Sequence, residues 1–349
     1  MRRDKTPPWV LVALLLAGIA APFLFPAYIL QIAILWIMVM FAVTWDIMGG
    51  QMGYNSLGNI TFFGVGMYIT GLVQVGLFTD IGPYTSARGG EQLVLNHADY
   101  FYGLLLGLAA ASVGCAILAV LIGQTMFGLR GAYFAIGTLG IALSARELFG
   151  TWEWVGGGSG IALPVYPGYP DEKSQIFYWL CFVLAILAFM FVRWLYSTRF
   201  GLAINAIRDD EDKAEAMGIH TNRHKSFAWS VSAFFLGISG GLFGNMTGFV
   251  EPAEVAFPVV TFGIFMVAMS LLGGKGTLWG PVIGAVLFHV VKETTWTYFL
   301  GWQWIALGVI IIVNVVFFQQ GIMGWLIMKF PERFGIAVDR SGSRDGGAQ

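Results

Sequence analysis

Few residues in this chain have the types and spacing that chemistry requires. Lys275 lies among glycines at residues 273–277, which resembles a phosphate-binding loop, but the usual glycine spacing is absent and no Ser or Thr follows the lysine. Four scattered histidines and two cysteines in apolar runs show no metal-ligand spacing. The sequence therefore predicts no catalytic residue, no metal site and no cofactor.

Ionisable residues inside apolar stretches are the next candidates for chemistry. His289, Lys292 and Glu293 share one helical face, and Arg146 and Glu147 lie near the outer end of another predicted helix. Each is a functional candidate by default. Their outer-leaflet positions favour local pairing or snorkelling. A ladder of midplane carboxylates is absent, which weakens the hypothesis of an ion-coupled transporter.

The strongest signal is a charged segment at residues 197–225. It holds ten of the chain's 39 charged residues, between long apolar runs. Asp209 or Asp210 is typical of a helix N-cap, acidic residues follow, and Gly218 is typical of a helix end. The pattern predicts a helix of two turns, which needs a packing partner because it is so short.

The charge of this short helix bears on what it contacts. Residues 208–215 carry two positive and five negative charges, whereas a helix lying on an anionic membrane surface should be basic. A solvated surface helix is the alternative. The acidic pattern favours docking to a soluble cytoplasmic protein.

The elements that position these residues are membrane helices. The 349 residues are 57% hydrophobic and only 11% charged, which excludes an ordinary soluble domain. We expect an all-α polytopic membrane protein with about ten spans. Their approximate bounds are 9–28, 29–48, 60–78, 101–123, 132–150, 175–196, 226–249, 257–273, 280–300 and 302–319. The first could instead be a signal peptide, and glycines leave open that 60–78 is re-entrant.

The basic residues orient the chain. With the N-terminus in the cytoplasm, 15 of the 19 basic residues fall in inside segments, as the positive-inside rule requires. We expect a transmembrane domain at residues 1–338, with both termini cytoplasmic, and a disordered cytoplasmic tail at 339–349. The net charge of −1 argues neither for nor against a nucleic-acid partner, and we expect none.

Two further patterns concern the interior of the bundle. Asn55, Ser56 and Asn59 lie among glycines at membrane depth, where they line a pathway or make interhelical hydrogen bonds; the sequence leaves both open. Glycines repeat every fourth residue, which favours internal helix packing, although a seam with another membrane subunit would use the same pattern. The packing glycines are Gly237, Gly241, Gly244, Gly276, Gly280 and Gly284.

Four groups of residues, in the right order, resemble permease subunits of ATP-binding-cassette (ABC) importers for branched-chain amino acids, the LivM-like family. The similarity runs from about the second expected span to the tenth. The groups are Ser56-Leu57-Gly58 with Phe62-Phe63-Gly64, Leu129-Arg130-Gly131 with Tyr133-Phe134-Ala135, residues 206–211 with Met217-Gly218-Ile219, and Gly273-Gly274 with Gly280-Pro281. The third group is the most specific.

The resemblance implies a function and partners. It implies a bacterial inner-membrane permease that pairs with a homologous permease, two cytoplasmic ATPase subunits and a periplasmic or extracellular binding protein. It adds Tyr133 to the pathway candidates. It also implies that the charged loop couples to the ATPase through Arg208, Asp209, Asp210, Glu211, Ala214, Glu215, Met217 and Gly218.

Departures from the family pattern bear on the substrate. The family usually has Gln where Tyr54 stands and His where Asn59 stands, and an acidic residue common near Ser144 is absent. Branched-chain or other hydrophobic amino acids are the favoured substrates, and urea or short amides are the alternative. A secondary transporter and a membrane scaffold are the competing classes.

Overall fold

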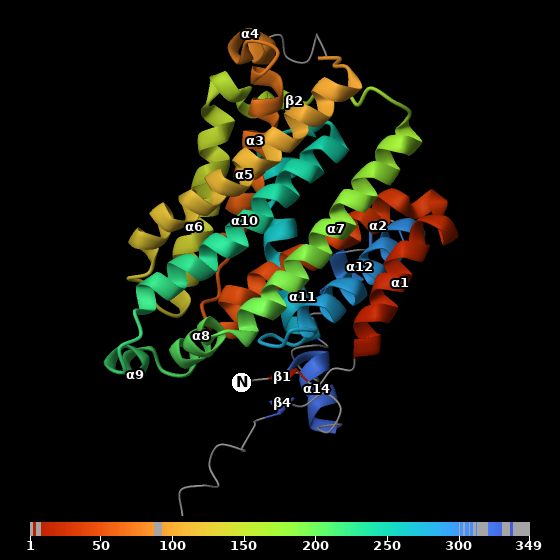
Figure 1. Ribbon diagram of the computed structural model, residues 1–349. Coiled ribbons are helices and arrows are strands. Elements are labelled where there is room, and N and C mark those ends of the chain that lie inside the picture. The colour runs from red at the N-terminus through yellow and green to blue at the C-terminus, as the bar shows by residue number, and fades with distance from the viewer. Residues whose placement is uncertain are drawn as a thin grey trace, which may run out of the picture.

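Long apolar helices running between two opposite ends dominate the computed structural model (Figure 1). It describes residues 3–4, 8–86, 93–299, 301–302, 304–306, 308–309, 312, 320–329 and 336–337. Most of the expected tenth span and the whole expected tail at 339–349 lie outside the described residues.

The long helices follow the apolar runs of the sequence. They are α1 (Pro8–Leu24), α2 (Ile29–Asp46), α3 (Ile60–Gly76), α5 (His97–Met126), α6 (Ala132–Thr151), α7 (Pro170–Ser197), α10 (Thr221–Thr247), α11 (Ile264–Gly273) and α12 (Gly280–Tyr298). The shorter ones are η1 (Pro26–Tyr28), η2 (Ile47–Gln51), α4 (Ile81–Ser86), η3 (Glu153–Val155), η4 (Gly157–Ser159), α8 (Arg199–Asp209), α9 (Glu211–Ala216), η5 (Pro252–Ala256), η6 (Val259–Gly263) and α14 (Gly321–Lys329).

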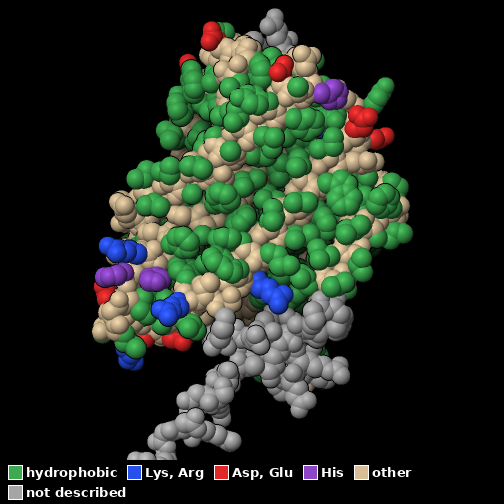
Figure 2. Space-filling view, in the orientation of Figure 1, with side chains coloured by type: hydrophobic (Ala, Val, Ile, Leu, Met, Phe, Trp, Pro, Cys, Tyr) green, Lys and Arg blue, Asp and Glu red, His purple; other side chains and the backbone are tan. Residues whose placement is uncertain are grey.

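The surface of the bundle is that of a membrane protein. Within the described residues, six helical segments are long and apolar enough to cross a bilayer, and α3 and most of α1 form shorter apolar helices. Figure 2 shows hydrophobic side chains over the middle of one face, with charged side chains gathered at the two ends. The prediction of an all-α polytopic membrane protein is confirmed. The number of about ten spans stays a prediction.

Glycines bring α10 close to its neighbours α3 and α5. A Cβ atom on Gly240 would lie 2.0 Å from the carbonyl oxygen of Phe63 in α3, and one on Gly237 would lie 2.7 Å from that of Ala111 in α5. Gly241 and Gly244 are equally crowded, by Thr70 and Met67. Only glycine permits this approach, so the close contacts of α10 lie inside the chain. Because α3 is one continuous helix, a reversal within residues 60–78 is not observed.

The glycines near residue 280 do not form one helical face. Gly280 and Gly284 lie in α12, where a Cβ on Gly284 would meet the carbonyl oxygen of Met269 at 1.9 Å. Gly276 lies in the preceding loop, with φ of +76°. The prediction that Gly276 continues the helical repeat is therefore wrong, because α12 begins only at Gly280.

Two short antiparallel sheets lie at opposite ends of the bundle (Figure 1). Strand β1 (Arg3–Asp4) pairs with β4 (Ile336–Ala337) at the end that also holds α8 and α9. At the other end, β2 (Ile161–Ala162) pairs with β3 (Phe249–Val250), and the Tyr84 hydroxyl of α4 donates to the carbonyl oxygen of Ala162. We call β2, β3, α4 and η3 the outer plate, after the orientation that the positive-inside rule predicts.

Candidate functional site

Helix α9 forms where the charge pattern predicts it. The Asp210 carboxylate accepts a hydrogen bond of 3.0 Å from the backbone N–H of Lys213 and so caps the first turn. At the other end Gly218 adopts φ of +87°, and the Ile219 N–H donates to the Ala214 carbonyl oxygen. The prediction of a short helix between an aspartate cap and Gly218 is confirmed.

The two faces of α9 differ. Met217, just past the last turn, is 83% exposed, and Asp209, Glu215 and Gly218 are exposed as well. Ala214 is buried, and the Glu211 side chain is only 12% exposed. The outer face and the tip are therefore open to a partner, while Glu211 and Ala214 point into the bundle.

Three side chains from separate parts of the bundle surround the Glu211 carboxylate. Its Oε1 accepts from the Lys225 ammonium of α10, and its Oε2 accepts from the Tyr54 hydroxyl. Arg130, from the turn between α5 and α6, lies 3.6 Å from Oε2 and also pairs with Asp212 at 2.9 Å. Burial acts to raise the pKa of Glu211, but the hydrogen bonds from Lys225 and Tyr54 outweigh it and hold the pKa below its ordinary value.

Glu211 therefore joins α9 to the bundle through Lys225 of α10 and through Tyr54 of the segment before α3. Its coupling to an ATPase subunit stays a prediction. A single sequence carries no signal for either contact, because α9 is too short for its apolar periodicity to reveal the inner face.

Arg208 lies at the C-terminal end of α8, next to the start of α9. Its guanidinium pairs with the neighbouring Asp209 at 3.0 Å. Its aliphatic stem covers Gly53, where a Cβ would lie 3.1 Å from Arg208 Cγ. Gly53 adopts a positive φ of +80°, a conformation that favours glycine. Here the end of α8 packs against the segment that carries Tyr54.

The four pathway candidates fall into two groups. Ser56 and Asn59 are buried and bonded within the bundle: the Ser56 carbonyl oxygen accepts from Trp45 Nε1 at 2.6 Å, and Asn59 Oδ1 accepts from Trp229 Nε1 at 2.9 Å. The Asn59 bond joins the start of α3 to α10, as the packing alternative expects, whereas the Ser56 carbonyl joins α2 to the segment before α3 and the Ser56 hydroxyl accepts from the Gly58 N–H at 3.3 Å. Asn55 is exposed, and Tyr133 is 75% exposed at the start of α6.

Tyr133 belongs to an exposed face of α6 that is unusually polar for a membrane helix. At helical spacing it continues through Gly140, Ser144, Glu147 and Thr151, all exposed. A Cβ on Gly140 would have no neighbour within 4 Å. Lipid tails offer no hydrogen-bond partner to the hydroxyl groups of Tyr133 and Ser144, so this face suits contact with protein or water.

Asp46 is a buried carboxylate that the sequence analysis does not single out. It ends α2, and the Gln51 side chain one turn later donates at 2.7 Å to the carbonyl oxygen of Gly276. The signal that could have found Asp46 is a carboxylate within an apolar span. Other intramembrane charges pair locally, as expected: Lys292 donates to Glu293 at 2.7 Å, and Arg146 lies 3.9 Å from Glu147.

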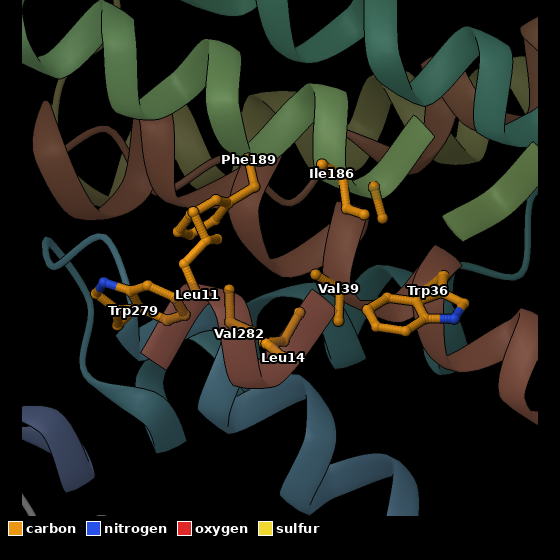
Figure 3. Close-up of a pocket in the computed structure, with 9 residues that line it drawn as sticks. Leu11, Leu14, Trp36, Val39, Ile186, Phe189, Trp279 and Val282 are labelled. Atoms are coloured by element: carbon orange, nitrogen blue, oxygen red, sulfur yellow. The ribbon is translucent and has the colours of Figure 1, made fainter. Parts of the chain in front are cut away.

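A pocket between α1, α2, α7 and α12 is apolar throughout (Figure 3). Leu11, Leu14, Val39 and Phe189 converge on it, and Trp36 and Trp279 flank it. It offers no charged group to a zwitterionic solute, so it serves helix packing rather than recognition of such a solute.

Comparison with known proteins assigns the family. A family model described as "Branched-chain amino acid transport system / permease component" matches residues 25–318. This chain belongs to that permease family. The permease is 29% identical over 336 residues to the high-affinity branched-chain amino acid transport system permease protein LivM of Escherichia coli K12, covering 86% of this chain and 74% of that protein.

More distant relatives broaden the picture. Over 119 residues the permease is 30% identical to a probable branched-chain amino acid transport permease, LivH, of Methanocaldococcus jannaschii, covering 34% of this chain and 36% of that protein. It is 26% identical over 236 residues to the autoinducer 2 import system permease LsrC of Yersinia pseudotuberculosis, covering 58% and 64%. No solved structure matches. The chain is therefore a multi-pass membrane permease.

Proposed function

We propose that this permease is the transmembrane subunit of an ABC importer that receives its substrate from a soluble binding protein. The observation that carries the proposal is α9, a capped helix fixed through its inner face, with an acidic outer face and the exposed tip Met217. The sequence contains no nucleotide-binding motif, so we assign ATP hydrolysis to two cytoplasmic ATPase subunits that dock on this outer face.

The exposed face of α6 supports pairing with a second, homologous permease. Tyr133 and Ser144 would lack hydrogen-bond partners against lipid, and together with Glu147 they would line half of a shared, water-filled pathway. Methanocaldococcus jannaschii has relatives named LivM and LivH, two permease proteins, which agrees with a heterologous pair. Asn55 remains a proposed pathway residue at the inner end.

The proposed substrates are branched-chain or other hydrophobic amino acids. The names of the LivM and LivH relatives support this class, while LsrC, by its name, imports autoinducer 2. In this proposal the binding protein selects the substrate and docks on the outer plate. The end with α8, α9, β1 and β4 faces the cytoplasm of a bacterial cell, and the chain lies in its inner membrane.

Replacing Met217 with Arg tests the docking face. We expect the purified complex to lose its ATPase subunits while the amount of inserted permease is unchanged, because a charge at the tip opposes an apolar contact. Thr79→Arg, which adds the same charge at the opposite end, serves as the control. Full recovery of the ATPases with Met217→Arg would contradict the docking assignment. Uptake by permeases alone along an ion gradient would instead indicate a secondary transporter.

A further inference from the structure

Lys225 is the most deeply buried cation in the part of the chain that the structure describes. Its side chain is 1% exposed, and its ammonium lies 4.4 Å from the centre of the Tyr54 ring and 5.9 Å from that of Phe127. Among the described residues, Glu211 is the single carboxylate within ion-pair distance. A buried charge needs a partner, and a shift of α9 that removed Glu211 would leave the Lys225 ammonium buried and unpaired.

The other ion pairs of α9 lack this property. Lys213 pairs with Asp210 at 2.9 Å, but its side chain is 82% exposed. Solvated pairs of this kind contribute little, because water screens them and replaces the lost partner. The burial of the Lys225–Glu211 pair therefore gives α9 one preferred position against α10.

Tyr54 extends the connection from α9 into three membrane helices. Its ring packs edge-on against Phe134 of α6, with ring centres 5.1 Å apart. The ring centres of Phe134 and Trp229 of α10 are 5.9 Å apart, and Trp229 Nε1 donates a hydrogen bond to Asn59 Oδ1 at the start of α3. A displacement of α9 must therefore move or break contacts with α3, α6 and α10 together.

We propose that the Lys225–Glu211–Tyr54 cluster transmits the movement of α9 to the membrane helices, with Lys225 and Glu211 as positioning residues for transport. The inference rests on the proposed docking of the ATPases to α9. In this proposal the ATPases dock on the outer face of α9, and the inner face of α9 transmits its movement to the membrane helices. Loss of the cluster should leave an assembled, ATP-hydrolysing complex that moves little substrate.

The test uses the whole importer in proteoliposomes and measures substrate moved per ATP hydrolysed. We expect Glu211→Gln and Lys225→Met each to keep the ATPase subunits bound while transport per ATP falls about tenfold or more. The charge-swapped pair Glu211→Lys with Lys225→Glu should recover part of the loss. Arg223→Met, which removes an exposed cation from α10, the helix that carries Lys225, should match the wild type.

Several results would overturn the inference. Wild-type transport per ATP in either folded single variant would show that the cluster transmits nothing. Loss of the ATPases from Glu211→Gln would mean that Glu211 contacts the partner itself. If the single variants fail to insert, the charge-swapped pair becomes the test. A swapped pair that inserts and hydrolyses ATP but recovers no transport per ATP would also reject the proposed role of the cluster. A wild-type complex that does not use ATP for uptake would refute the proposed function instead.

Discussion

The carboxylate of Asp46 accepts a hydrogen bond of 2.8 Å from the backbone N–H of Gly276, 230 residues further along the chain. Gln51 binds the carbonyl oxygen of the same glycine, so side chains near the end of α2 satisfy both backbone groups of one loop residue. The partly buried loop between α11 and α12 is fixed to α2 in this way. Buried backbone groups require such partners.

This bond predicts different outcomes for two substitutions of Asp46. Asp46→Ala removes the acceptor and should lower the free energy of unfolding by about 1–3 kcal/mol. Asp46→Asn keeps an acceptor oxygen at the same place and should lose less. Thermal unfolding in detergent compares the two variants. Equal losses would show that the charge of Asp46 matters, and the hydrogen bond does not.

Alanine substitutions at two helical glycines should differ in their effect. Gly240→Ala would place a methyl group 2.0 Å from the Phe63 carbonyl oxygen, forcing α10 from α3 at a cost of about 1–3 kcal/mol. Gly140→Ala meets nothing within 4 Å and should be neutral or stabilise the helix by up to about 1 kcal/mol. Unfolding midpoints of the two variants measure this. A stable Gly240→Ala protein would disprove the close packing.

Cysteine labelling tests the polar face of α6. Ser144→Cys should react with a water-soluble maleimide in the assembled importer, because we assign this face to a water-filled pathway. Leu187→Cys, on the exposed apolar face of α7, should stay unlabelled in lipid. The native Cys115 and Cys181 are buried and give little background. Labelling of Leu187→Cys alone would reject the pathway assignment.

The ion pair of Glu211 predicts a pH dependence. Its pKa lies below the ordinary 4.5, so the folded state holds its proton less tightly than the unfolded chain. The stabilisation is present above pH 4.5 and is lost as the pH falls through the folded pKa. The difference in melting temperature between wild type and Glu211→Gln should therefore be largest near about pH 6 and shrink towards about pH 3. A difference independent of pH would contradict the ion pair.

Local chemistry made much of this architecture predictable. The cap at Asp210 and the left-handed Gly218 depend on neighbouring residues alone, and the apolar run at 132–150 became α6 almost to the residue. Hydropathy and capping act over a few turns, so one sequence suffices for them.

The contacts that give the site its geometry could not be predicted, because they join distant residues. Tyr54 and Glu211 are 157 positions apart. Lys225 is the last residue of the charged segment at 197–225, yet its side chain is buried. Only the tertiary fold places its ammonium between Glu211 and the ring of Tyr54.

Helix α10 contacts both ends of the molecule. Its 27 residues span about 40 Å, from Lys225 beside α9 at one end to strand β3 of the outer plate at the other. Linkage makes such a connection reciprocal. If a ligand of the outer plate favours one position of α10, it changes the affinity of α9 for its partner by some factor. That partner must change the affinity at the outer plate by the same factor.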